Sequence, residues 1–141
     1  MIKDSREEPK LIGELNLSTE ELLYEDCVGR INFSNNIGEC KIYVYSNEGT
    51  IPHFHIISKN NQESCICIYE PLYFNHGSKV MRLNSKQRKE LDNWLNQLSD
   101  VNRSNTNWDI IDIAWKIGNG YEYVPKNAEK PNYKNLVNMR G

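Results

Sequence analysis

The sequence predicts an α+β fold, in which an antiparallel β-meander of about four to five strands packs against two C-terminal helices, with one short helix near the N-terminus. Two observations indicate this fold. Segments with strand-like alternation of apolar residues fill the first half of the chain, and segments with helical spacing follow them. Strands followed by helices, rather than alternating with them, are typical of α+β domains. The length of 141 residues fits a single domain.

Five segments are predicted to be strands. The clearest runs from Glu39 to Ser46, where Ile42 and Val44 share one face and the tyrosines share the other. The strand that follows is opened by a proline, which is tolerated at the start of a strand. A turn at Asn60-Asn61 joins it to a hairpin partner. The other predicted strands cover residues 11–17, 29–34, 51–58 and 64–70.

Three helices are predicted from capping residues and apolar spacing. Ser18 and Glu21 form a capping box that begins a short helix ending near Asp26. A longer helix begins at Asn84 or Ser85 and ends near Leu98, with an apolar stripe at i, i+3, i+4 and i+7. The last helix begins near Asn107 and ends at Gly118 or Gly120.

We expect one folded domain over residues 11–120. Residues 1–10 are polar and are expected to be flexible. Residues 121–141 are rich in Asn, Lys and Pro and are expected to form an extended tail whose tyrosines could dock on the domain. No apolar run reaches the roughly 18 residues that a membrane span needs, and the N-terminus lacks the apolar region of a signal peptide. We therefore expect a cytoplasmic protein, located in the host cytoplasm if it is phage-encoded.

The net charge of the whole chain would not attract nucleic acid. The formal net charge is -2, so only a local basic cluster could meet phosphates. One such cluster is a solvated rim in one interpretation and a phosphate-binding surface in the other. It comprises Lys79, Arg82, Lys86, Arg88 and Lys89.

Two histidines, His53 and His55, stand one residue apart in the third strand and therefore project to the same side. Such a pair could share a zinc ion if the thiols of Cys65 and Cys67, on the partner strand, faced the same side. A two-residue turn at Asn60-Asn61 would pair Phe54 with Cys67 and put the thiols on the opposite side, whereas a three-residue loop would reverse this. Asn-Asn suits the two-residue turn, so the cysteines are predicted to lie in the core. No cofactor is expected; the alternative is a divalent metal, with His76 as a weaker third ligand.

The catalytic interpretation compares this stretch with the histidine-triad nucleotide hydrolases, which carry an H-x-H-x-H run on a strand. Ile51 stands where the first histidine would be. Under this hypothesis, His53 or His55 would serve a metal-dependent or phosphoryl-transfer enzyme, such as a toxin acting on RNA or nucleotides.

The segments "KIYVYSNEGTIPHFHI" and "SCICIYEP", together with the helix at Leu83–Leu95, resemble a small bacterial and phage family, the domain of unknown function 4160 family. The resemblance covers about residues 29–120, and P-H-F-H at Pro52–His55 is its most specific part. Ile51 replaces the first proline of the family's P-P-H-F-H run. The resemblance implies no established activity, but it implies a toxin–antitoxin or host–phage conflict setting.

We therefore expect a non-enzymatic interaction module that binds a protein partner or a second copy of itself through one face of the sheet. The alternatives are the enzyme described above and a phage virion or cargo component. The face is predicted to carry His53, His55, Ile57, Ile66 and Ile68.

Overall fold

The computed structural model describes residues 10–18, 38–74 and 81–138 of the chain. At its centre is a six-stranded sheet whose strands follow one another in sequence order. The first four strand pairs are antiparallel, and the last strand joins its neighbour in parallel. The strands are β1 (Lys10–Leu17), β2 (Gly38–Val44), β3 (His53–Ser58), β4 (Glu63–Cys67), β5 (Leu72–Tyr73) and β6 (Val137–Asn138).

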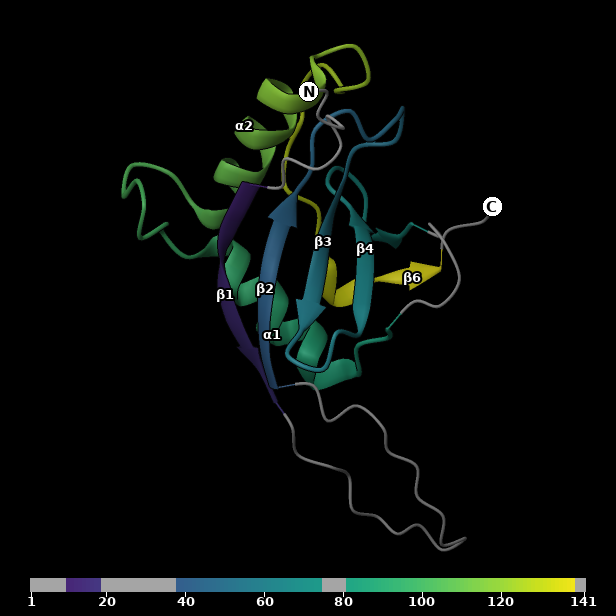
Figure 1. Cartoon of the computed structure of the whole chain (residues 1–141), viewed down its shortest axis with the longest axis vertical. Coiled ribbons are helices and arrows are strands. Elements are labelled where there is room, and N and C mark those ends of the chain that lie inside the picture. Colours follow the sequence, from purple (N-terminus) through teal and green to yellow (C-terminus); the bar gives the residue numbers. More distant parts are fainter. Residues whose placement is uncertain (1–9, 19–37, 75–80, 139–141) are drawn as a thin grey trace, which may run out of the picture.

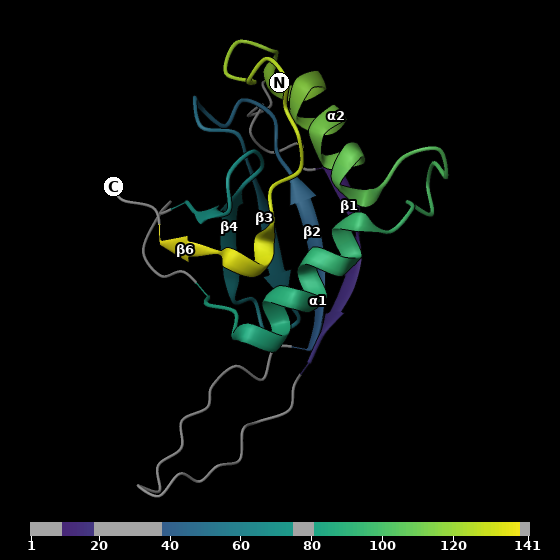
Figure 2. The same cartoon turned by 180° about the vertical axis from the view of Figure 1, so that it is seen from behind.

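Two helices, α1 (Ser85–Asn96) and α2 (Asn107–Asn119), cover one face of the sheet (Figures 1 and 2). Each begins with a capping box, in which Asn84 caps α1 and Thr106 caps α2. These caps satisfy backbone N–H groups that a helix leaves without partners at its start. The predicted α+β fold, an antiparallel meander with two C-terminal helices, is confirmed.

The core lies between the sheet and the helices. Ile42, Phe54 and Ile66 project from successive strands toward the helices and are completely buried. They belong to one apolar cluster with Leu91 of α1 and Trp115 of α2. Strand alternation places the histidines of β3 on the other side from Phe54.

The segment after α2, predicted to be an extended tail whose tyrosines could dock, packs on the domain through one of them. Tyr133 lies in a short 3-10 helix (Tyr133–Asn135) and is completely buried. Its hydroxyl donates to the carbonyl oxygens of Cys67 and Ile68, and β6 extends the sheet at β5. The packed domain therefore continues beyond residue 120, because the tail supplies an aromatic side chain that the core needs.

Several predicted features lie outside the described residues. These are the short N-terminal helix, the strand at 29–34, Cys27, His76 and Lys79. In the part of the chain that the structure describes, no helix is both long and apolar enough to cross a membrane.

Candidate metal centre

The hairpin between β3 and β4 has a three-residue loop, so the predicted register is wrong. Ser58 N–H donates to the carbonyl oxygen of Gln62 at 2.8 Å, and Asn61 N–H donates back to Ser58 at 2.9 Å. Asn61 has a φ of 65°, whereas Asn60 is not among the described residues with a positive φ. A two-residue type I′ turn would need positive φ at both asparagines. The Ser58 hydroxyl also accepts from the N–H groups of residues 60 and 62, which favours the longer loop.

This one-residue difference brings histidines and thiols to the same side. His53 pairs with Cys67 and His55 pairs with Cys65. Because directly paired residues project to the same face, the prediction that the cysteines lie behind the histidines is overturned.

The predicted partner-binding face is divided by the same change. Ile66 pairs with Phe54, so Ile66 and Ile68 lie on the core side and are completely buried. Of the five residues predicted for that face, Ile57 is the one that stays partly exposed on the side of the histidines. His53 and His55 are themselves buried, so they do not form a surface that a partner could contact directly.

His53 lies at the sheet end, beyond the last β2–β3 pair, which joins Tyr43 to His55. Its ring centroid is 4.5 Å from that of Phe74 and 5.6 Å from that of Trp115 in α2. Its Nδ1 is 2.7 Å from the carbonyl oxygen of Ile51. A carbonyl oxygen only accepts hydrogen bonds, so Nδ1 of His53 carries a proton and donates it.

His55 is held in the same way by an acidic side chain. Its Nδ1 is 2.5 Å from Oε2 of Glu63, a residue at the exposed start of β4. Sγ of Cys65 lies 3.4 Å from the same nitrogen. The Tyr45 ring covers the imidazole at a centroid distance of 4.6 Å. With Nδ1 of each histidine facing an acceptor, Nε2 is the ring nitrogen that could coordinate an ion after losing its proton.

The Nε2 nitrogens of both histidines face the carboxylate of Glu48, a residue that the sequence patterns did not indicate. Oε1 of Glu48 lies 2.8 Å from Nε2 of His53 and 2.8 Å from Nε2 of His55. The Glu48 side chain is only 5% exposed, although the residue belongs to the β2–β3 loop. No periodicity points to a loop residue, and the single available signal is that a carboxylate precedes the histidine strand.

The pKa values of Glu48 and His55 are shifted by burial and by their neighbours. Burial alone would raise the pKa of Glu48, but the hydrogen bonds from His53 and His55 outweigh it and hold that pKa well below its ordinary value. Burial alone would lower the pKa of His55, but hydrogen bonds to Cys65 and Glu48 raise it to about 10. The thiol of Cys67 lies in a less polar place, where burial raises its pKa to about 12.

The buried donor set could hold a metal ion. His53, His55 and Cys65 each offer one ligand atom, and these atoms lie within 4.8 Å of one another. Zinc bonds of about 2.0–2.3 Å would place such atoms roughly 3.5 Å apart, which is within the same range. The same groups also satisfy one another without an ion, since every buried side-chain nitrogen and oxygen of the described residues has a hydrogen-bond partner.

The basic cluster is partly used inside the fold. The Arg82 guanidinium lies over the Tyr73 ring at 5.0 Å. Arg88 donates to the carbonyl oxygens of Leu83 and Lys134. Lys86 and Lys89 are exposed residues of α1. Two of the four described members thus help to hold the chain after β5.

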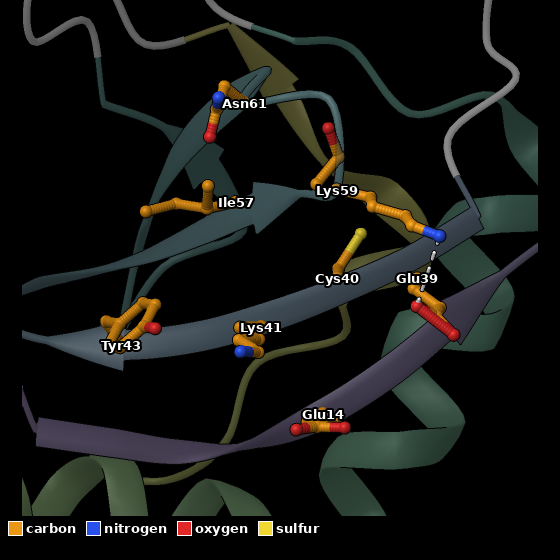
Figure 3. A pocket seen from close by; sticks show the side chains of 9 residues that line it. Glu14, Glu39, Cys40, Lys41, Tyr43, Ile57, Lys59 and Asn61 are labelled. Carbon is orange, nitrogen blue, oxygen red and sulfur yellow. Dashed lines mark ion pairs between the residues drawn. The ribbon is translucent and has the colours of Figure 1, made fainter.

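A groove of about 380 Å³ lies elsewhere on the sheet, around β1, β2, β3 and the hairpin loop (Figure 3). Charges of both signs line it. Lys59 and Glu39 form an ion pair of 3.9 Å, with both side chains at least 70% exposed. The groove is lined by Glu14, Glu39, Cys40, Lys41, Tyr43, Ile57, Ser58, Lys59 and Asn61.

No family model, curated protein or solved structure matches this chain. The resemblance to the domain of unknown function 4160 family therefore stays a prediction.

Proposed function

We propose that this protein binds one divalent transition-metal ion of the zinc class, with His53 and His55 as the central ligands. Glu48 is the third ligand. Cys65 is the fourth and would have to move on binding, because its Sγ lies 3.4 Å from Nδ1 of His55, the ring nitrogen that does not face Glu48. The observation that carries the proposal is the direction of the imidazoles. Each keeps Nδ1 on an acceptor, Ile51 O or Glu63, and turns Nε2 to the same carboxylate oxygen. Metal-bound histidines usually donate their other ring N–H to a carbonyl or carboxylate in this way.

The types of donor select the class of metal. Imidazole nitrogen and thiolate sulfur suit zinc and its soft neighbours, whereas magnesium and calcium prefer oxygen donors throughout. One Glu48 oxygen among nitrogen and sulfur donors is compatible with zinc. We therefore expect zinc, with cobalt(II) as a useful spectroscopic substitute.

The burial of the ligands favours a structural ion over a catalytic one. The side chains of His53 and His55 are 0% and 7% exposed. Catalytic zinc sites keep a coordination position open to water or substrate, whereas structural sites are closed by protein ligands. The proposed ion would join the β2–β3 loop to β3 and β4, and so stabilise an interaction module rather than cut a substrate.

Elemental analysis of the native, full-length chain tests the proposal. We expect about one equivalent of zinc in the wild-type protein and none in the His53→Ala/His55→Ala variant. Added zinc should stabilise the wild-type protein by about 2.7 kcal/mol at a hundredfold excess over Kd, and should leave the double variant unchanged.

The third histidine of the chain gives a matched control. A His76→Ala variant should keep the metal if His53 and His55 are the central ligands. A wild-type protein that neither contains a transition metal nor gains thermal stability from added zinc would contradict the proposal. The cluster would then be a self-contained polar network.

A second candidate function is protein binding or dimerisation through the groove of Figure 3. The observation that favours it is a surface that joins two acidic and two basic side chains to the partly exposed Tyr43 and Ile57. Two copies of such a surface can pair with opposite charges facing each other. Light scattering after size-exclusion chromatography tests this: Ile57→Glu should abolish a dimer, and a monomeric wild-type protein would exclude self-association.

A further inference from the structure

We infer that Asn119, at the end of α2, is a positioning residue for the metal ligand Glu48, and that it couples the ion to α2. The inference rests on the proposed metal site. Three proposed ligands lie on paired strands, whereas Glu48 lies in a loop and needs other contacts to fix its position.

The β2–β3 loop is bound to α2 at Glu48 and at the residues just before it. The side-chain oxygen of Asn119 accepts from Glu48 N–H at 2.7 Å, and its amide group donates to the carbonyl oxygen of Tyr45 at 2.9 Å. One amide side chain therefore spans the loop from Tyr45 to Glu48. Asn47 N–H adds a third link, to the carbonyl oxygen of Gly118 at 3.3 Å.

The backbone on either side of Glu48 has an unusual conformation. Asn47 has a φ of 52° and Gly49 a φ of 101°, so both neighbours of Glu48 adopt left-handed conformations. Glycine adopts positive φ freely, and asparagine adopts it more readily than other residues do. The contacts to Gly118 and Asn119 hold the loop in this conformation at Asn47 and Glu48.

Close packing between Gly118 and Ser46 also holds the loop against α2. A Cβ added at Gly118 would lie 3.1 Å from Cβ and 3.2 Å from Cα of Ser46. The absence of a side chain at Gly118 thus lets α2 approach the loop closely. Both hydrogen bonds given above for the Asn119 side chain go to backbone atoms of the loop, so it would act on the ion through the backbone of Glu48.

Zinc titration of the full chain, in a double-mutant cycle, tests the coupling. Asn119→Ala should weaken zinc binding about 10–100-fold, as is usual when an outer-shell partner is removed. In a Glu48→Gln background the same change should have no further effect, because the residue acts through that carboxylate. Equal losses in both backgrounds would mean a general structural role and would overturn the inference.

Two further variants sharpen the result. Gly118→Ala keeps every hydrogen-bonding group of Asn119 but presses on Ser46, and should also weaken zinc binding. Asn93→Ala, an exposed asparagine of α1, is the control and should leave affinity unchanged.

A metal-free measurement keeps the inference separate from the proposed function. In the apo protein, Asn119→Ala should move the imidazole ¹⁵N chemical shifts of His53 and His55 toward those of Glu48→Gln, because the carboxylate leaves both rings. Unchanged shifts would overturn the role of Asn119 even if zinc binds. A wild-type protein that fails to bind zinc would remove the metal site, while these shifts would still decide whether Asn119 positions Glu48.

Discussion

At the scale of single residues, the decisive side chains of this protein are polar and buried together. A buried carboxylate without partners costs several kcal/mol, so Glu48 can stay in this place because two imidazoles donate to it. Buried ion pairs of this kind seldom increase stability compared with apolar residues. Their presence in so small a domain therefore favours a use for the cluster, and metal binding is the use that its donor types suit.

The role of Cys65 can be separated from the general effect of buried thiols. Cys65→Ser should weaken zinc binding more than the loss of about 10–100-fold expected for an outer-shell residue. It should also remove the thiolate-to-metal absorption of the cobalt(II)-substituted protein, because serine offers no thiolate.

Cys67 gives a control on the same strand. It is also buried and faces the same side, but it does not belong to the group of donors within 4.8 Å. Cys67→Ser should keep the cobalt absorption band. If the Cys67 variant lost the band and the Cys65 variant kept it, the assignment of the fourth ligand would be wrong.

At the scale of elements, the β3–β4 hairpin decides which side chains meet. Its loop contains one residue more than the asparagine pair suggests, because Lys59 joins the turn while Ser58 remains paired with Gln62. Strand side chains alternate with a period of two, so a single extra loop residue changes the face of every side chain on β4. The conformation of this short loop thus determines whether the thiol of Cys65 reaches the histidines.

Substitutions at the two loop asparagines should therefore differ. Asn61→Val should destabilise the fold by about 1 kcal/mol, because a β-branched residue is strained at positive φ. Asn61→Gly should be neutral or slightly stabilising, since glycine adopts this conformation freely. Chemical denaturation of both variants measures these differences.

The neighbouring position supplies the comparison. Asn60→Val should cost less than Asn61→Val, because Asn60 is exposed and is not a positive-φ residue. Equal costs at the two positions would show that the left-handed conformation of Asn61 is not what holds the register.

At the scale of the whole molecule, the C-terminal segment closes the core. Asp92 of α1 accepts from the ammonium of Lys130 at 2.6 Å and from the backbone N–H of Tyr133 at 2.9 Å. The Tyr133 ring packs edge-on against Phe54, and its hydroxyl reaches the end of β4. Tyr133 therefore joins the sheet, α1 and the C-terminal segment. Phe54, the residue of β3 that it contacts, lies between His53 and His55 in the sequence.

Loss of the Tyr133 hydroxyl should destabilise the whole domain. Tyr133→Phe leaves the ring in place but removes the donor to Cys67 O and Ile68 O, and such buried losses cost about 1–3 kcal/mol. Thermal unfolding should show a lower midpoint for this variant. Tyr123→Phe, at a tyrosine that is 45% exposed, should leave the midpoint unchanged; similar shifts for both would contradict a core role for the tail.

Local sequence patterns were enough to predict the class of fold, the central strands, both long helices, and the projection of His53 and His55 to the same side of a strand. These features follow from local periods and capping chemistry, which neighbouring residues carry. Only the tertiary structure decided that Cys65 joins the histidines, that Glu48 lies between them and that Tyr133 enters the core. Those three depend on a loop conformation and on contacts between distant segments, which no local pattern encodes.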